Sequence, residues 1–136
     1  MDDLSNASVV ATSGMQAQSK RLRVVAENLA NAQSVAITPG GDPYRRKEIV
    51  FQDVLDRATG VKKVVANDTV EDMSDFAREF RPGTPGADAK GYVLTPNVVP
   101  LVEVQDMREA QQTYQANLQV MATSHDMISK TLDLLK

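Results

Sequence analysis

The chain has 136 residues, a formal net charge of −3 and 42% hydrophobic residues. This length fits one ordinary domain, and the slight acidity gives no electrostatic support to binding nucleic acid or an anionic membrane. The sequence contains no cysteine, which excludes disulfides, thiolate zinc sites and cysteine nucleophiles.

Residues 1–31 are predicted to form a long N-terminal helix with a heptad pattern. At alternating strides of three and four residues, mostly apolar or small side chains fall on one face. These positions are Leu4, Ser8, Ala11, Met15, Gln18, Leu22, Val25 and Leu29. The stretch has no apolar core of a signal peptide, and no apolar run in the chain approaches the roughly 20 residues of a membrane span. We therefore expect no direct membrane insertion and, if the protein leaves the cytoplasm, no cleaved signal peptide.

Two asparagines, Asn28 and Asn31, lie within one turn at the end of this helix. Asparagine is a middling helix former because its side chain bonds to nearby backbone groups. One interpretation is a fraying helix end with Asn31 as its C-cap. The other is a pair of amides that bind a neighbouring backbone, either in this chain or in the next subunit.

Residues 32–97 are predicted to form a loop-rich β insert with a small core of its own. Clusters of Pro, Gly and Asp at 38–43 and 81–88 indicate loops. Extended segments are expected over 44–51, 61–70, 76–80 and 91–94, the second of them interrupted at Asn67–Asp68. Asn97 is the expected N-cap of the next helix, with Pro100 in the first turn, where a missing N–H is harmless.

Residues 98–136 are predicted to form a second heptad helix, free of Pro and Gly after Pro100. Its seam positions are Val104, Met107, Gln111, Tyr114, Leu118, Met121, His125, Ile128, Leu132 and Leu135. Such a helix is far longer than the average of about 11–12 residues, so its seam needs an equally long partner. We expect the two terminal helices to form one shared helical domain, paired as an antiparallel-like coiled coil. Leu22, Val25 and Leu29 are predicted to pack against Tyr114, Leu118 and Met121.

Catalytic chemistry has no support in the sequence. His125 is the sole histidine, so metal binding and histidine-based relays lack partners. The chain has none of the glycine-rich phosphate loops, nucleophile elbows or HExxH motifs that mark common enzyme classes. The carboxylates lie in polar segments and are interpreted as solvated faces. We therefore expect no enzyme activity, no catalytic residue, no cofactor and no metal.

Several motifs resemble those of bacterial flagellar axial proteins. Residues 26–31, Ala-Glu-Asn-Leu-Ala-Asn, resemble the A-x-N-[LI]-A-N signature of their N-terminal helix, and residues 114–117, Tyr-Gln-Ala-Asn, resemble their C-terminal Y-x-A-N signature. Between them, segments at 43–46, 50–51, 82–85, 87–88, 91–93 and 96–98 are similar in order and spacing to the FlgC family of proximal rod proteins. Thr84 and Gln112 depart from the family pattern, which usually has histidine and arginine there.

This resemblance implies a structural subunit of the flagellar basal-body rod, mainly α-helical with a small β insert. The rod is a helical drive shaft that crosses the periplasm and transmits torque to the hook and filament. The implied partners are other rod proteins, further copies of the chain and the flagellar type III export apparatus, with no nucleic acid and no small-molecule substrate. The alternative is a soluble or type III-secreted coiled-coil adaptor that binds a single partner through the same seam.

Twelve residues are predicted to make helix-pair and assembly contacts. The seam contributes apolar and aromatic side chains, and the motif resemblance alone contributes the three asparagines. The set is Leu22, Val25, Asn28, Leu29, Asn31, Met107, Tyr114, Asn117, Leu118, Met121, Ile128 and Leu132.

Overall fold

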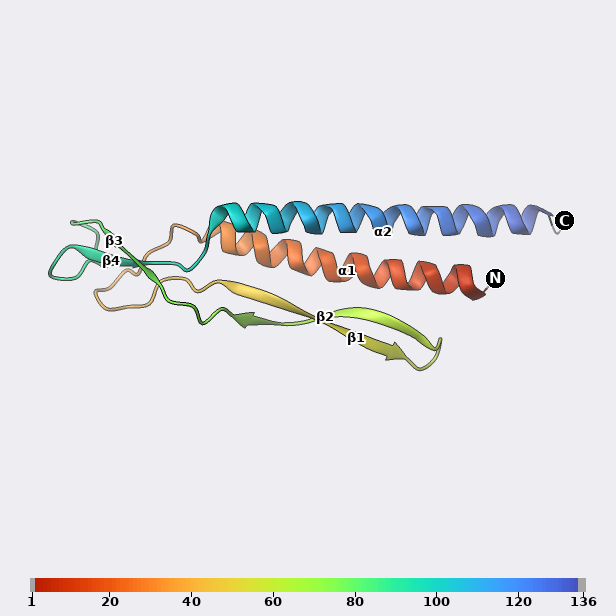
Figure 1. The fold of residues 1–136 in the computed structure, drawn as a ribbon, viewed down its shortest axis with the longest axis horizontal. Coiled ribbons are helices and arrows are strands. Elements are labelled where there is room, and N and C mark those ends of the chain that lie inside the picture. Colours follow the sequence, from red (N-terminus) through yellow and green to blue (C-terminus); the bar gives the residue numbers. More distant parts are fainter. Residues whose placement is uncertain (1, 135–136) are drawn as a thin grey trace. The chain divides into compact units, whose positions relative to one another are not determined.

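The fold is mainly α-helical with a small β insert, as the sequence predicts (Figure 1). The computed structural model describes residues 2–134; Leu135, the last predicted seam position, lies outside them. The elements follow in the order α1 (Asp2–Ala30), β1 (Lys47–Asp56), β2 (Val61–Glu71), β3 (Ala77–Phe80), β4 (Tyr92–Thr95) and α2 (Pro100–Leu134).

The chain forms two compact units, each built from separate stretches of sequence. Unit 1 comprises Met1–Leu22, Ile49–Asp68 and Arg108–Lys136, and unit 2 comprises Arg23–Glu48 and Thr69–Met107. Each unit therefore takes part of both helices, because the chain passes between the units along α1, β1, β2 and α2.

In unit 1, α1 lies between α2 and the β1–β2 hairpin. Toward the hairpin, Ser13 Oγ accepts a hydrogen bond from the backbone N–H of Val64 at 3.3 Å. Lys20 Nζ donates to the carbonyl of Ala66 at 3.0 Å. The buried side chains of this unit are small, and they are Ala11, Ser13, Ala17, Ala66, Ala110 and Ser124. Small side chains let neighbouring backbones approach closely.

The β1–β2 hairpin closes at Gly60, which adopts the left-handed conformation with φ of 68°. Its N–H donates to the carbonyl of Asp56 at 2.8 Å, and glycine enters this region without steric cost. The predicted interruption at Asn67–Asp68 is wrong, because β2 continues through both residues to Glu71. Both side chains are exposed there, so their poor strand propensity meets no packing conflict.

Unit 2 contains the second hairpin, in which β3 pairs antiparallel with β4 from Ala77 opposite Thr95 to Phe80 opposite Tyr92. The aromatic rings of Phe80 and Tyr92 pack edge to face with their centroids 5.3 Å apart, an arrangement that aromatic pairs prefer. The apolar core of this unit is valine-rich and consists of Val24, Val25, Val93 and Val98.

Helix α2 begins at Pro100, as the missing N–H of proline permits. The prediction that Asn97 caps this helix is wrong. The backbone carbonyl of Val99 accepts from the N–H groups of Val102 and Glu103, while the Asn97 amide is engaged elsewhere in unit 2. Within residues 2–134, neither helix combines the length and apolarity that crossing a bilayer would need.

Candidate functional site

Asn28, near the end of α1, uses all four hydrogen-bonding positions of its amide. Its Nδ2 donates to the carbonyl of Lys47 at 2.8 Å and to Glu103 Oε2 at 3.0 Å. Its Oδ1 accepts from the Tyr44 hydroxyl and from the N–H of Lys47, both at 2.9 Å. The side chain is 1% exposed. This amide therefore ties α1 to the start of β1 and to the first turn of α2.

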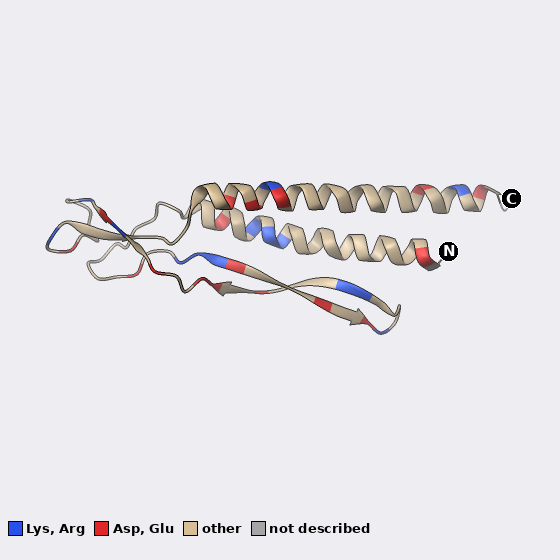
Figure 2. Ribbon diagram, viewed as in Figure 1, with Lys and Arg blue, Asp and Glu red and all other residues tan. Residues whose placement is uncertain are grey.

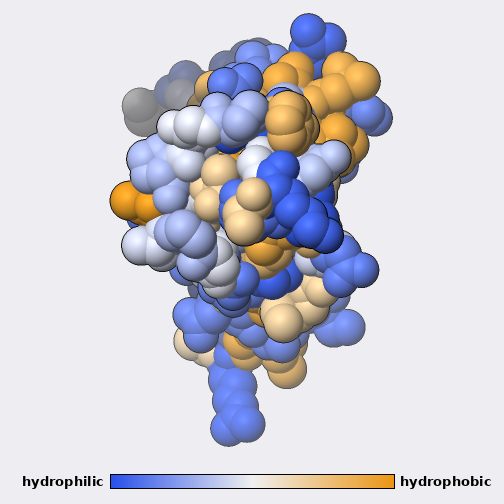
Figure 3. Space-filling view, turned by 90° about the vertical axis from the view of Figure 1, so that its left-hand side faces the viewer, coloured by the Kyte–Doolittle hydropathy of each residue, from blue (hydrophilic) through white to orange (hydrophobic). Residues whose placement is uncertain are grey.

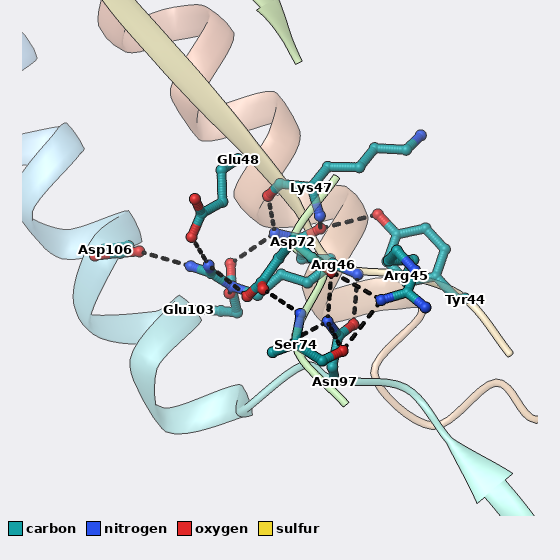
Figure 4. A network of polar contacts seen from close by, with 11 residues as sticks. Tyr44, Arg45, Arg46, Lys47, Glu48, Asp72, Ser74, Asn97, Glu103 and Asp106 are labelled. Carbon is teal, nitrogen blue, oxygen red and sulfur yellow. Dashed lines mark hydrogen bonds and ion pairs between the residues drawn. The ribbon is translucent and has the colours of Figure 1, made fainter. Parts of the chain in front are cut away.

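Glu103 is fully buried, and its partner is the guanidinium of Arg46 (Figure 4). Arg46 Nε donates to Glu103 Oε1 at 2.6 Å. The same guanidinium lies 3.6 Å from Asp72 Oδ2 and 3.6 Å from Asp106 Oδ2, and it also pairs with Glu48. A buried carboxylate is tolerated only when it is paired and hydrogen-bonded, and both Glu103 oxygens have partners here.

Asn97 extends this polar junction, which we define as Asn28, Tyr44, Arg46, Asp72, Asn97 and Glu103. Its Oδ1 accepts from the N–H of Arg46 at 2.8 Å, and its Nδ2 donates to the carbonyl of Asp72 and to Ser74 Oγ, both at 2.9 Å (Figure 4). Arg45 also donates to the Asp72 carbonyl, at 3.0 Å. The junction therefore connects the ends of both helices with both sides of the long hairpin's base.

The charge states of the junction match its hydrogen bonds. Burial raises the pKa of the Tyr44 phenol, and the charge of Glu27 adds to this effect. The hydroxyl therefore stays protonated and donates to Asn28. Burial lowers the pKa of the Arg46 guanidinium, but the hydrogen bond and charge of Glu103 outweigh it, and the net pKa is raised. Because Arg46 stays charged, it remains a counter-ion for Glu103.

Unit 2 is expected to lose stability in acid. The N–H and hydroxyl of Ser74 lower the pKa of Asp72, and the N–H groups of Tyr92 and Lys90 lower that of Asp88. A lowered folded-state pKa contributes stability above the unfolded-state pKa of about 4, and this stability is lost as the pH falls through the folded value. The melting temperature should therefore fall below about pH 4.

The substitution Asp88→Asn tests this expectation, because the amide oxygen still accepts the two backbone bonds but does not titrate. The variant should lose less of its melting temperature between pH 5 and pH 3 than the wild-type chain does, as read by circular dichroism. Identical acid profiles for the two proteins would contradict the assignment.

In unit 1, the two helices run antiparallel in one register. Thr12 Oγ1 lies 3.8 Å from Met121 Sδ, and Arg21 pairs with Glu109 at 3.3 Å. A Cβ placed on Gly14 would lie 2.7 Å from Asn117 Nδ2. Thr12 and Gly14 therefore lie opposite Met121 and Asn117.

The predicted pairing of Leu22, Val25 and Leu29 with Tyr114, Leu118 and Met121 is wrong. The contact of Arg21 with Glu109 in unit 1 and that of Asn28 with Glu103 in unit 2 show that these α1 residues lie opposite earlier parts of α2. The apolar pattern does not specify register, because a heptad seam can slip by whole repeats and keep its chemistry.

The face that α2 buries also differs from the predicted seam at alternate positions. The stops at Met107, Met121 and Ile128 are shared, Tyr114 and Leu132 are exposed, and four buried or half-buried positions fall one residue before a predicted stop. The buried and half-buried side chains at this spacing are Glu103, Met107, Ala110, Asn117, Met121, Ser124 and Ile128. Small and polar residues thus occupy the inner positions next to Gln111, Leu118 and His125, which are exposed, whereas Val104 is half-buried beside Glu103. Small side chains on the inner face of α2 allow α1 to pack close to it, which larger side chains would prevent.

The structure divides the twelve predicted contact residues into three groups. Val25 and Asn28 are buried, and Leu118 and Leu132 are each 45% exposed, with Tyr114 36% exposed. The others are half-buried, and they are Leu22, Leu29, Asn31, Met107, Asn117, Met121 and Ile128. The Asn31 amide donates to the carbonyl of Glu27 at 2.9 Å, so it bonds its own helix end.

The sequence reasoning missed Arg46, Asn97 and Glu103 as members of the junction. The sequence predicts Asn97 only as a helix cap and Arg46 only as part of the extended segment 44–51. The signal that marks Glu103 is its place one residue before Val104, where it would share the inner face of α2 with Met107. A carboxylate there requires a buried cation, but the sequence alone does not show which of the many Arg and Lys residues supplies it.

Both helices carry a long stretch without charge in unit 1. Residues 4–19 and 110–125 contain no Asp, Glu, Lys or Arg, and they are tan in Figure 2. Four large hydrophobic side chains on these stretches are exposed: Val10 at 37%, Tyr114 at 36%, Leu118 at 45% and Val120 at 47%. Burying an uncharged surface costs much less than burying charges, so this surface suits contact with another protein. We call it the uncharged helix surface.

Apolar side chains also reach the surface elsewhere. The β1–β2 hairpin exposes Val50, Phe51, Val54, Leu55 and Val65 in unit 1. In unit 2, Ile37, Met73, Val99 and Leu101 are more than half exposed, and Figure 3 shows orange side chains among hydrophilic ones on the side it faces. Scattered apolar residues are normal on a monomer, but large exposed sets indicate protein contacts.

His125 lines an open groove of about 370 Å³ in unit 1, together with Ser8, Thr12, Gln16 and Lys63. Lys63 is already paired with Asp56. Among residues 2–134, no three His, Cys, Asp or Glu side chains are grouped as a metal site would need.

Comparison with known proteins identifies related sequences along the whole chain. The family model described as "Flagella basal body rod protein" matches residues 9–35, and that described as "Flagellar basal body rod FlgEFG protein C-terminal" matches residues 89–134. The flagellar basal-body rod protein FlgC of Agrobacterium fabrum is 51% identical over 136 residues, covering 100% of this chain and 98% of its own. FlgC of Escherichia coli O6:H1 is 46% identical over 92% of each chain, and that of Aquifex aeolicus is 33% identical over 100% of each.

Proposed function

The chain belongs to the FlgC family of flagellar basal-body rod proteins, and we propose that it occupies the proximal rod, a helical drive shaft that crosses the periplasm. Membership makes it a structural subunit of the basal body that assembles with other rod components. This outcome favours the rod over the adaptor that the sequence left open.

The uncharged helix surface carries the proposal that α2 is the main assembly element. In unit 1, α2 turns small and polar side chains toward α1 and leaves Leu118 and Val120 exposed. A neighbouring rod subunit, or another copy of the chain, can cover them without burying a charge. Repeated contacts of this kind that do not close into a ring generate a helical assembly. Transmission of torque to the hook and filament then follows from the packed helices.

The remaining parts of the proposal concern export and chemistry. The subunit reaches the rod through the flagellar type III apparatus without a cleaved signal peptide, and it inserts in no membrane. It binds no nucleic acid and no small-molecule substrate, and it has no catalytic activity. The twelve predicted contact residues keep their assembly role here, Leu118 and Leu132 on the outside of α2 and Val25 and Asn28 inside unit 2. The division into helical domain (1–31 with 98–136) and insert (32–97) is also retained.

Limited proteolysis of the purified full chain tests whether the helices depend on neighbours. Isolated helices are marginal in water, and the unit 1 part of α2 buries only one narrow face. The junction, in contrast, holds the helix ends in unit 2. Trypsin should therefore cut a monomer first at Arg108 and Lys130, the exposed sites on the unit 1 part of α2, as read by mass spectrometry and light scattering. A closed dimer with both sites protected would favour the adaptor instead.

A further inference from the structure

Gly14 is the only glycine within α1. Because it has no side chain, the amide of Asn117 can lie close to the backbone of α1 there. A Cβ at this position would lie 2.7 Å from Asn117 Nδ2, 3.1 Å from Asn117 Cγ and 3.3 Å from Asn117 Oδ1. Real Cβ atoms essentially never come within 3.0 Å of a non-bonded atom, so a side chain at position 14 would force the Asn117 amide to move. The amide of Asn117 therefore fills the space that any other residue at position 14 would claim.

A glycine in the middle of a helix costs about 1 kcal/mol relative to alanine. The helix nevertheless continues without a break from Asp2 to Ala30, and Gly14 has no positive φ that would require glycine. The close approach of Asn117 is the structural feature that explains this choice.

Neighbouring positions on α1 cannot take the amide in the same way. A slip of one turn would bring Asn117 opposite Val10 or Ala11 in one direction, and opposite Ala17 or Gln18 in the other. Each of these residues has a Cβ, so the amide would meet an atom that Gly14 lacks. Among these registers, only the observed one therefore places the Asn117 amide opposite Gly14, the residue without a Cβ.

We propose that the Gly14–Asn117 contact fixes the register of the antiparallel helix pair in unit 1. The apolar seam allows several registers, and this contact selects one of them, which the contacts of Thr12 with Met121 and Arg21 with Glu109 share. The register decides which side chains of α1 lie beside Leu118 and Val120. It therefore determines the composite surface that a neighbouring subunit meets.

The cysteine-free sequence allows a direct test by engineered disulfides. In the Thr12→Cys/Met121→Cys variant, Gly14 and Asn117 stay in place, and the 3.8 Å between Thr12 Oγ1 and Met121 Sδ puts the two positions opposite each other, as a disulfide requires. The control pairs join Met121→Cys with Ser8→Cys or with Gln16→Cys, about one helical turn away from Thr12 in either direction. The proposal predicts roughly tenfold faster intramolecular oxidation of the first pair than of either control.

The oxidation is followed in isolated basal bodies, so this test rests on the proposed function. Absence of the chain from basal bodies would contradict the proposed function. Presence of the chain with equal oxidation of all three pairs would overturn the register proposal and leave the proposed function intact.

A second experiment tests whether the contact matters for assembly. Gly14→Leu should shrink swimming rings, because leucine is a good helix former and its harm must come from the clash with Asn117. Adding Asn117→Ala should restore at least half of the lost ring diameter. Ser19→Leu, at an exposed position of the same helix, is the matched control and should swim normally. A double variant no better than Gly14→Leu alone would overturn the proposal.

Discussion

Leu118→Asp is expected to abolish swimming and rod completion while the subunit is still made and exported. Leu118 is 45% exposed in the single chain, so the substitution removes little from unit 1. In the rod, the new carboxylate would lie within the charge-free stretch 110–125, against a covering neighbour. Burying an unpaired charge costs at least several kcal/mol. A loss of this size in the free energy of association is enough to prevent one contact between subunits from forming.

Three measurements separate assembly from folding and export in this variant. Swimming rings report motility, electron microscopy of isolated basal bodies reports rod completion, and immunoblots of the exported fraction report export. Ser129→Asp is the matched control, because it adds the same charge at an exposed α2 position among Asp126, Lys130 and Asp133. The control should swim. Normal motility of Leu118→Asp would remove the uncharged helix surface from the assembly interface.

Asn28→Asp is expected to destabilise the folded chain by about 3–5 kcal/mol at pH 7. The change preserves the shape of the side chain but removes both Nδ2 donors. The lost bonds run to the carbonyl of Lys47 and to Glu103 Oε2, at 2.8 and 3.0 Å. A second carboxylate would then lie against the buried Glu103, and two carboxylates at that distance cannot both stay ionised cheaply.

The pH dependence of this loss has a definite sign. In the folded variant, repulsion between the new carboxylate at position 28 and that of Glu103 raises the pKa of the pair above its unfolded-state value. The variant's deficit relative to wild type should therefore be smallest below about pH 4 and should grow as the pH rises through the raised value.

Melting temperatures of both proteins at each pH, read by circular dichroism, measure this deficit. Gln33→Glu is the control, since it makes the same amide-to-acid change at an exposed residue just beyond α1. A deficit that does not change with pH would show that Asn28 and Glu103 are not coupled as the junction requires.

Helix and strand locations follow closely from the sequence because their signals are local. The heptad strides place both helices to within a few residues of Asp2–Ala30 and Pro100–Leu134. Turn residues separate the four strands in the right order. These features depend on backbone preferences and on the spacing of apolar residues. Both can be read directly from the sequence.

The face of each helix and the register between them do not follow from the same pattern. Large apolar residues such as Leu118 suggest themselves for the seam, yet Ala110, Asn117 and Ser124 occupy it. A surface that other subunits cover in an obligate assembly can be nearly as apolar as a core, so hydrophobicity alone does not distinguish residues buried within the subunit from residues buried between subunits. Close approach of the helices favours small residues at the contact. The distance of approach depends on both helices together, so the pattern of one helix does not reveal it.

The sequence by itself determined the two long helices, the β insert between them and, through its motifs, the family. Tertiary structure decided the junction, because Asn28, Arg46, Asn97 and Glu103 are far apart in the chain and only folding shows which buried donor meets which acceptor. It also decided the register, because Gly14 and Asn117 acquire their meaning only when the two backbones come close. Local signals define elements, whereas pairing of distant polar groups and steric fit define how the elements are joined.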